Sequence, residues 1–319
     1  MIKGLGTALI TPFKADKSVD YDALARLLDT QLNGFVDYIV VLGTTGEAAT
    51  MTEEEKKEVR QFIVNYVRNH PIPSLEGRPG GVLPLVLGVG GNNTAAVCET
   101  LRTMDLNGFS AILSVCPYYN KPNQEGLFQH FCAVAEASPI PVILYNVPGR
   151  TGVNLLPETV MRIYNAHPDK ICGIKEASGN VEQIKHLIQL SNTPSLERVK
   201  SSARSDCQWP SVEHLGEGFP PLLVLSGDDG IACELMEAGA AGLISVASNA
   251  FPEDFWHIVH DKDAALQAKY AEMIKLLFAE GNPVGIKAVL AQKGLIDNYL
   301  RLPLVPASAE LNRRISAII

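Results

Sequence analysis

The chain has 319 residues, of which 46% are hydrophobic, and its formal net charge is −8. This composition excludes wholesale disorder, and the length indicates one large α/β domain or a domain with an appendage. The net negative charge gives the chain no overall positive potential that would attract nucleic acid. No apolar run is long enough to span a bilayer. The six cysteines are scattered without a CxxC pair, as is typical of a reducing compartment. We therefore expect a cytoplasmic protein that binds neither nucleic acid nor a membrane.

Short apolar runs alternate with amphipathic segments along the chain. We predict strands at residues 5–10, 38–42, 85–88, 111–115, 142–145, 171–175, 222–226 and 242–246. We predict helices at residues 22–31, 52–67, 94–106, 124–137, 157–166, 181–190, 231–238 and 252–259. Thr52 and Glu55 have the spacing of a capping box, and Pro157 and Pro252 suit the first turn of a helix.

Eight strand–helix pairs predict parallel strands with helical crossovers, which is the pattern of a (β/α)8 TIM barrel. An open doubly wound sheet is the alternative, but no GxGxxG motif follows the first strand. We expect the barrel to occupy residues 1–262. Helical patterns at 264–277, 284–293 and 308–318 predict a C-terminal helical domain at 263–319. Two inserts, near 71–84 and 191–221, fall between a helix and the next strand and are predicted on the bottom face as decoration or subunit contacts.

Polar residues gather where the predicted strands end, which is where a barrel places its active site. Lys175 ends an apolar strand, and burial there favours the neutral amine, the form that attacks a ketone. The resulting Schiff base is an electron sink that needs no metal, nucleotide or flavin. A lysine paired with a carboxylate is the alternative for this residue. Glu176 does not decide between them, because consecutive strand residues point to opposite faces.

Other strand ends offer groups for binding and proton transfer. Thr44 and Thr45 lie between two glycines, in a turn that can receive a small carboxylate or be merely a turn. Tyr119 and Tyr145 can relay protons, although each can also be a packing residue. Arg150 lies in a predicted loop and suits a carboxylate clamp, the alternative being a solvated surface residue.

A metal site is not predicted. Asp228 and Asp229 have no histidine near them in the sequence, and a role at a helix start explains two adjacent acids better. The seven histidines are scattered, and none lies at a predicted strand end. The sequence also has no P-loop, no GxSxG elbow and no HExxH motif.

Several of these segments together resemble one known family. They are Gly43-Thr44-Thr45-Gly46-Glu47, Pro117-Tyr118-Tyr119-Asn120-Lys121-Pro122, and residues 145–152, 173–179, 226–229, 282–283 and 301–304. Through them the chain resembles the pyruvate-dependent class I aldolase family, which includes dihydrodipicolinate synthase and N-acetylneuraminate lyase, from Gly6 to about Pro306. Arg150 favours the synthase branch, because sialic-acid lyases lack an arginine at that position.

The resemblance implies condensation of pyruvate with L-aspartate 4-semialdehyde to 4-hydroxy-tetrahydrodipicolinate, in lysine and diaminopimelate biosynthesis. It implies that Lys175 forms the Schiff base and that Thr44, Tyr145 and Tyr119 form a proton relay. Tyr119 would reach the site of a neighbouring subunit, so a homo-oligomer is expected, normally a tetramer. The substrate-binding residues implied are Thr45 for the pyruvate carboxylate, Gly227 and Ile244 in the pyruvate pocket, and Arg150 for the semialdehyde carboxylate.

The family's feedback inhibitor, lysine, binds at the tight dimer interface where it binds at all. The matching positions here are Ala48, Ala49, Glu53, Lys56, Asn92, Ala96 and Tyr118. Sensitive enzymes carry a histidine or similar group and an acid in this set, whereas Lys56 and Ala96 supply neither. Although Glu53 can compensate in part, we predict weak or absent inhibition by lysine.

Two other functions remain open on the sequence. One is a different 2-keto acid aldolase of the same family, acting on sialic acid or a keto-deoxy sugar acid. The other is a catalytically silent, ligand-binding paralogue. The presence of the lysine and both tyrosines argues against the second of these.

Overall fold

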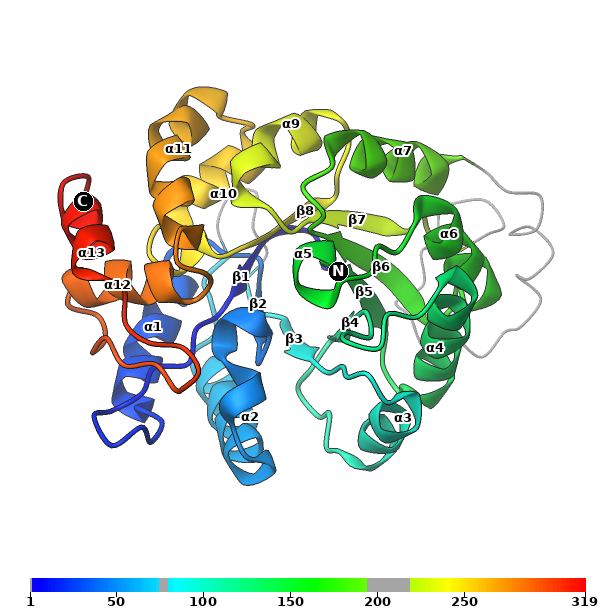
Figure 1. Cartoon of the computed structure of the whole chain (residues 1–319), viewed down its shortest axis with the longest axis horizontal. Helices are drawn as coiled ribbons and strands as arrows, with labels where there is room; N and C mark the ends of the chain where they lie inside the picture. Colours follow the sequence, from blue (N-terminus) through cyan, green and yellow to red (C-terminus); the bar gives the residue numbers. More distant parts are fainter. Residues whose placement is uncertain (1, 75–79, 194–218) are drawn as a thin grey trace.

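The computed structural model describes residues 2–74, 80–193 and 219–319. Eight parallel strands form a closed barrel in which strands adjacent in sequence are adjacent in space, and β8 pairs with β1 (Figure 1). The strands are β1 (Gly4–Ala8), β2 (Tyr38–Val41), β3 (Leu85–Gly88), β4 (Ala111–Val115), β5 (Val142–Asn146), β6 (Ile171–Glu176), β7 (Leu223–Ser226) and β8 (Gly242–Ser245). The predicted TIM barrel is confirmed, and the open sheet is excluded.

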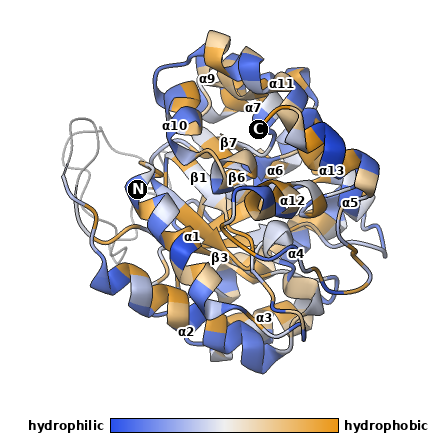
Figure 2. Cartoon of the chain, turned by 90° about the vertical axis from the view of Figure 1, so that its left-hand side faces the viewer, coloured by the Kyte–Doolittle hydropathy of each residue, from blue (hydrophilic) through white to orange (hydrophobic). Residues whose placement is uncertain are grey.

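Helices between the strands cover the outside of the barrel. They are α1 (Tyr21–Asn33), α2 (Glu53–Asn69), α3 (Thr94–Thr103), α4 (Gln124–Ala137), α6 (Pro157–Ala166), α7 (Val181–Asn192), α9 (Ala232–Glu237) and α10 (Pro252–His260). Figure 2 shows their hydrophilic residues alternating with hydrophobic ones, while the strands inside are mainly hydrophobic. Each helix therefore buries one face on the barrel and exposes the other.

Local signals set several helix starts as predicted. Thr52 caps α2: its hydroxyl accepts from the Glu55 N–H at 3.2 Å, and the Glu55 carboxylate accepts from the Thr52 N–H at 2.9 Å. Pro157 and Pro252 are the first residues of α6 and α10, where a proline loses no helical hydrogen bond. These local signals therefore set the residue at which each of the three helices begins.

The strands are buried on both faces, which explains their nearly continuous hydrophobicity. Tyr38, Val40, Ile143, Leu225 and Ile244 belong to the cluster that fills the barrel interior. A larger cluster packs the outer face of the barrel against the helices. The interior is therefore a packed core, and polar chemistry is confined to the ends of the strands.

Three further helices follow the barrel: α11 (Ala264–Phe278), α12 (Val284–Gln292) and α13 (Ala309–Ser316). They gather on one side of the barrel, beside α1 and α10 (Figure 1). The residues of α12 from Val284 to Leu290 are all buried. The helical character of the C-terminal part agrees with the prediction, while its status as a separate domain from residue 263 stays a prediction.

The two predicted inserts lie partly outside the described residues. In the first, Ile72 and Gly81 form an antiparallel bridge; in the second, only residues 191–193 and 219–221 are described. Both precede a strand, at the amino end of the barrel, so their flanks lie on the predicted face.

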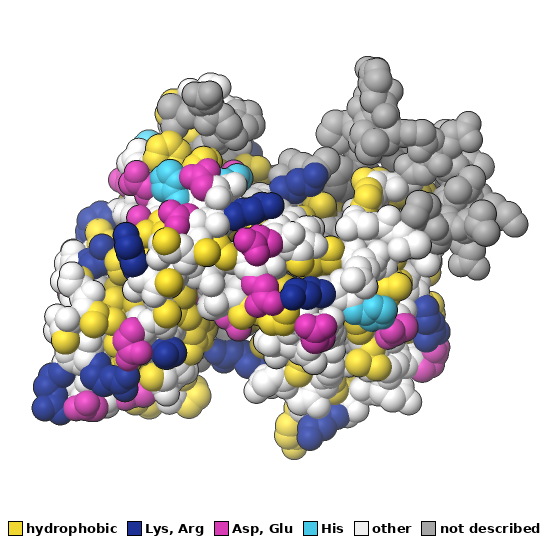
Figure 3. All heavy atoms as spheres, turned by 90° about the horizontal axis from the view of Figure 1, so that it is seen from above, with side chains coloured by type: hydrophobic (Ala, Val, Ile, Leu, Met, Phe, Trp, Pro, Cys, Tyr) yellow, Lys and Arg dark blue, Asp and Glu magenta, His cyan; other side chains and the backbone are white. Residues whose placement is uncertain are grey.

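Within the described part of the chain, no helix has the length and apolar composition needed to cross a membrane. On the face in Figure 3, acidic and basic side chains are interspersed.

Candidate active site

Lys175 lies at the carboxyl end of β6 with only 6% of its surface exposed. Its register partner on β5 is Tyr145, and the Lys175 Nζ lies 4.6 Å from the centroid of the tyrosine ring. Gly227, after β7, leaves the space that the lysine stem occupies, because a Cβ there would lie 2.9 Å from Lys175 Cε. Three predicted site residues therefore meet at one place in the barrel mouth.

Lys175 has no ion pair with any carboxylate among residues 2–74, 80–193 and 219–319. The carboxylate of Glu176 points to the other face of the strand. It accepts hydrogen bonds from Asn146 Nδ2 at 2.8 Å, Gln183 Nε2 at 3.1 Å and the Ser178 N–H at 2.7 Å. Burial raises the pKa of Glu176, and these donors oppose the shift. The described structure therefore does not contain the alternative in which Lys175 is paired with a carboxylate.

The predicted threonine turn after β2 is a single turn of 3₁₀ helix, Thr44–Gly46. The Gly46 N–H bonds to Gly43 O at 3.1 Å, and the Thr45 side chain is buried while that of Thr44 is exposed. The first N–H groups of such a turn have no partner within it and are suited to an anion. Leu42 and Glu47 flank the turn at φ values of 54° and 53°. Strained backbone of this kind often marks a functional site.

Residues of the C-terminal segment hold this turn. Asn282 Nδ2 donates to Thr45 Oγ1 at 2.9 Å. Lys287 Nζ lies 2.5 Å from Glu47 Oε1, and the Arg301 N–H donates to Glu47 Oε2 at 3.1 Å. Lys287 is fully buried, and this burial lowers its pKa to about 8 although Glu47 opposes the shift. The sequence reasoning missed these roles, although a lysine within the apolar run of α12 is a signal for a buried partner.

Arg150 lies in a short helix, α5 (Pro148–Thr151), and not in the predicted loop. Pro148 starts this single turn, and Gly152, at a φ of 74°, ends it in the left-handed conformation. The Arg150 side chain is exposed, and its Nη2 donates to Asn282 O at 3.4 Å. The same residue, Asn282, therefore contacts both the threonine turn and the arginine.

The two tyrosines after β4 lie on the surface. Tyr119 is 89% exposed and Tyr118 is 43% exposed. Their loop is held by two amides, since Asn92 Nδ2 donates to Tyr118 O at 3.1 Å and Asn120 Nδ2 donates to Asn92 O at 3.0 Å. In the described residues of one chain, no hydrogen bond joins Tyr119 to Thr44 or to Tyr145. The three-hydroxyl relay is therefore not complete within a single copy.

The segment after β7 connects the site to β8. Asp228 accepts from the Gly230 N–H at 2.8 Å, which is the predicted role at a helix start. Asp229 is the first residue of a short 3₁₀ turn, Asp229–Ile231, as predicted for an acid at a helix start. Its side chain also crosses to β8, where it accepts from Ser245 Oγ at 2.5 Å and from the Val246 N–H at 3.1 Å. Burial raises the pKa of Asp229 to about 6. Ile244, the other predicted pocket residue, is fully buried in the barrel interior.

Within the described residues, no group of three or more His, Cys, Asp or Glu side chains is placed to hold a metal ion.

The predicted regulatory positions lie close to the threonine turn. Ala48 and Ala49 form a second 3₁₀ turn directly after it. Lys56 is paired with Glu53, at 2.8 Å between Nζ and Oε1. The Glu53 carboxylate, the acid among the predicted regulatory positions, is thus already paired with the ammonium group of Lys56.

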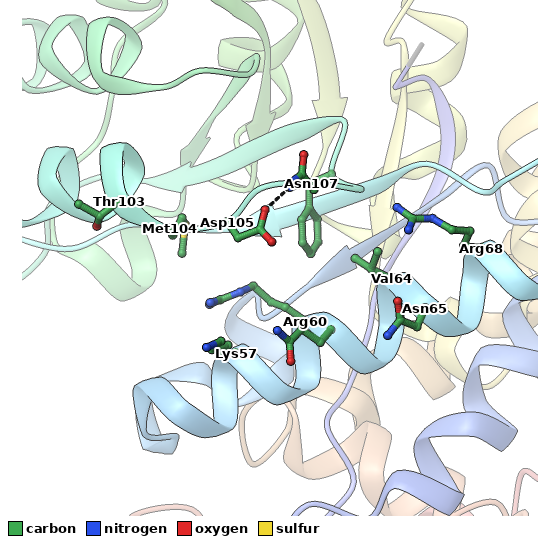
Figure 4. Close-up of a pocket in the computed structure, with 11 residues that line it drawn as sticks. Lys57, Arg60, Val64, Asn65, Arg68, Thr103, Met104, Asp105 and Asn107 are labelled. Atoms are coloured by element: carbon green, nitrogen blue, oxygen red, sulfur yellow. Dashed lines mark hydrogen bonds between the residues drawn. The ribbon is translucent and has the colours of Figure 1, made fainter.

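A hollow of about 670 Å³ lies between α2 and the segment that precedes β4 (Figure 4). Its lining includes Lys57, Arg60, Arg68, Asp105 and Phe109, and none of the predicted site residues. Residues 103–109 lead into the amino end of β4, whereas Lys175 lies at the carboxyl end of β6. This hollow is therefore separate from the candidate active site.

The sequence model described as the dihydrodipicolinate synthetase family matches residues 1–196 and 188–319. The chain belongs to the dihydrodipicolinate synthetase family. A curated relative, the 4-hydroxy-tetrahydrodipicolinate synthase of Parabacteroides distasonis, is 46% identical over 312 residues, covering 96% of this chain and 92% of its own length. The likeness therefore includes the barrel and the C-terminal helices.

Solved structures of the dihydrodipicolinate synthetase family have the same fold. The chloride-inhibited dihydrodipicolinate synthase of Acinetobacter baumannii, solved in complex with pyruvate, matches with a TM-score of 0.83 and 36% identity, covering 100% of this chain and 98% of that one. Another match is a dihydrodipicolinate synthase described as the first monomeric variant, with a TM-score of 0.82 and 35% identity, covering 99% and 95%. Membership in this family therefore does not by itself define an oligomeric state.

Proposed function

We propose that the chain catalyses the reaction of the 4-hydroxy-tetrahydrodipicolinate synthases, a lyase reaction of lysine and diaminopimelate biosynthesis. It condenses pyruvate with L-aspartate 4-semialdehyde to 4-hydroxy-tetrahydrodipicolinate. The likeness to relatives of that activity extends over nearly the whole chain, at 46% identity for the relative from Parabacteroides distasonis. The observation that carries the proposal is the enclosed amine of Lys175 at the barrel mouth, without a carboxylate partner in the described structure.

In this proposal Lys175 supplies the electron sink. Its Nζ attacks the ketone carbon of pyruvate, and loss of water gives an imine. Removal of a proton from the methyl carbon gives an enamine, which attacks the aldehyde carbon of the semialdehyde. The amino group of the semialdehyde then attacks the imine carbon, which closes the ring and releases Lys175. One water is lost overall, and no redox change occurs.

The groups around Lys175 have separate tasks. Thr45 and the backbone of its turn receive the carboxylate of pyruvate, while Gly227 and Ile244 line the pocket. Tyr145, whose ring lies beside the Lys175 Nζ, exchanges protons with the imine through its hydroxyl. Arg150 receives the carboxylate of the semialdehyde, for which its planar guanidinium is suited.

We further propose that the chain acts in the cytoplasm as a homo-oligomer, a tetramer, in which Tyr119 of one copy completes the relay of a neighbour with Thr44 and Tyr145. The support for this is the exposure of Tyr119, a large phenol that extends from the loop after β4 without a hydrogen bond in the described chain.

A coupled assay with both substrates tests the function, with Arg150→Ala as the informative variant. Loss of one charged hydrogen bond is worth about 1.5–3 kcal/mol, so kcat/KM for the semialdehyde falls by roughly 10- to 150-fold. The KM for pyruvate stays close to that of the wild type. Turnover of keto-deoxy sugar acids without turnover of the semialdehyde would contradict the proposal and favour another aldolase.

A further inference from the structure

Asn282 lies in the connection between α11 and α12, and its backbone and side chain face two different parts of the barrel mouth. Its Nδ2 donates to Thr45 Oγ1 at 2.9 Å, and its carbonyl oxygen accepts from Arg150 Nη2 at 3.4 Å. The residue is 8% exposed, and its Oδ1 is buried without a partner among the described residues. A side chain from the C-terminal segment thus reaches into the site across 237 residues of sequence.

The direction of this hydrogen bond constrains the hydroxyl of Thr45. A threonine hydroxyl has one proton to donate and two lone pairs that accept. Since the amide of Asn282 donates to the oxygen, the hydroxyl proton is not used in this contact. It remains free to point at an acceptor, and the acceptor in the proposed reaction is the carboxylate of pyruvate.

We propose that Asn282 is a positioning residue for pyruvate: its carboxamide fixes the Thr45 hydroxyl as a donor toward the substrate carboxylate. The inference rests on the function proposed above and adds a residue to it. Because the contact with Arg150 is made by the carbonyl oxygen of the main chain, replacing the side chain leaves that contact in place. The side chain of Asn282 therefore acts on the pyruvate subsite and not on the semialdehyde subsite.

Two substitutions separate this role from simple packing. Asn282→Ala removes the donor, so the Thr45 hydroxyl is free to rotate and pyruvate binding weakens. Asn282→Asp keeps the size and shape but replaces the donor with a carboxylate. The new oxygen accepts the threonine proton and repels the carboxylate of pyruvate. Donor loss alone predicts a moderate defect, and donor reversal predicts a larger one, whereas a packing role predicts the opposite order.

The experiment measures the pyruvate concentration that gives half-maximal trapping of the imine by borohydride, read by intact mass on the full-length chain. Asn282→Ala is expected to raise it about 3- to 10-fold, and Asn282→Asp by at least about 30-fold. In the coupled assay, the KM for the semialdehyde and kcat at saturating pyruvate stay within about twofold for Asn282→Ala. Asn312→Ala is the matched control, because Asn312 donates only within the C-terminal segment, to Ala307 O at 2.8 Å and Ser308 O at 3.0 Å.

A double-mutant cycle with Thr45→Val completes the test. Once the hydroxyl is gone, Asn282→Ala is expected to add less than about twofold to the half-saturating pyruvate concentration. An aspartate variant no worse than the alanine variant, or full additivity in the cycle, overturns the inference. If the wild-type chain traps pyruvate but all variants behave like it, only this inference fails. If the wild-type chain traps none, the proposed function fails and takes the inference with it.

Discussion

At the scale of single residues, the central feature is the setting of one amine. The Nζ of Lys175 lies over the Tyr145 ring, and its stem fills the space that a side chain at Gly227 would take. Its position at the end of an apolar strand makes it a candidate in the sequence, but a lysine paired with a carboxylate fits that position equally well. Alternation along the strand already places Glu176 on the opposite face from Lys175. What the sequence does not contain is the set of donors, from Asn146, Gln183 and Ser178, that bind the Glu176 carboxylate there.

Gly227→Ala tests how closely the site is built around Lys175. The added Cβ would lie 2.6 Å from Ala177 Cβ and 2.9 Å from Lys175 Cε, so the lysine stem must move. We expect at least a 10-fold loss of kcat, since small displacements of a reacting group are costly, and about 1–3 kcal/mol of destabilisation from overpacking. Steady-state kinetics and urea unfolding measure the two effects.

Gly149→Ala is the control for this substitution, because a Cβ at Gly149 meets no atom within 4 Å. It is expected to retain activity and stability. Equal activity of the Gly227→Ala variant and the wild type would show that the lysine has more room than the structure indicates.

Other residues of the site could not be predicted because their partners are distant in the sequence. Asn282 and Thr45 are 237 positions apart, and the pair Glu47 with Lys287 has a similar separation. Only closure of the barrel and docking of α12 bring them together. The bond from Ser245 Oγ to Asp229 could not be predicted for the same reason, since Ser245 comes from the next strand.

At the scale of elements, prediction succeeded where a local signal exists. The capping box of Thr52, the first-turn prolines of α6 and α10, and the apolar runs of β3 and β4 are all readable without tertiary structure. The helix α5 was missed because a single turn has no periodicity to detect. Its position matters more than its length, since it presents Arg150 to Asn282.

The contact between α2 and the segment after α12 gives stability a pH dependence. Arg301 donates to both carboxylate oxygens of Glu55, and these bonds lower the Glu55 pKa from 4.5 to about 2. A carboxyl whose pKa is lower in the folded than in the unfolded chain stabilises the fold fully at pH values above the unfolded pKa. This contribution is lost as the pH falls from about 4.5 toward 2. We expect Glu55→Gln to cost on the order of 1–2 kcal/mol at pH 7, because the pair is partly exposed.

Urea unfolding of the wild type and the Glu55→Gln variant at several pH values measures this contribution. The difference in unfolding free energy should shrink steadily below pH 4.5, where the unfolded glutamate becomes protonated. A difference that stays constant down to pH 3 would mean that the ion pair with Arg301 does not form in solution.

For the molecule as a whole, the central proposal is that Tyr119, which is exposed in one copy, completes the proposed relay of a neighbouring copy. Mixing subunits tests this. Tyr119→Phe and Lys175→Ala should each be nearly inactive alone. After the two are unfolded and refolded together, a mixed dimer has one site with an intact Lys175 and an intact Tyr119 from the neighbour, so activity should return.

Restoration of up to about a quarter of wild-type activity is expected in that mixture, from the share of sites that combine both intact residues. Mixing the two variants without unfolding is the control for exchange. Full activity of Tyr119→Phe alone, or no recovery after joint refolding, would contradict a shared site.

Inhibition by free lysine would also depend on the assembly of copies, because the predicted pocket for it lies at the interface between two of them. We expect weak or absent inhibition, since the Glu53 carboxylate is paired with Lys56 and that lysine opposes a cationic ligand. The coupled assay with increasing L-lysine measures this, and Lys56→Ala is expected to increase sensitivity. Inhibition of the wild type at micromolar lysine would show that the pocket binds the amino acid by other groups.

In the proposed mechanism, the imine between pyruvate and Lys175 is the step from which the rest of the chemistry follows. Incubation with pyruvate, reduction with borohydride, digestion and mass spectrometry identify the residue that carries the pyruvyl group. The account predicts a reduced adduct on Lys175 and none in the Lys175→Ala variant. An unmodified wild-type chain, or an adduct on another lysine that persists in the variant, would contradict it.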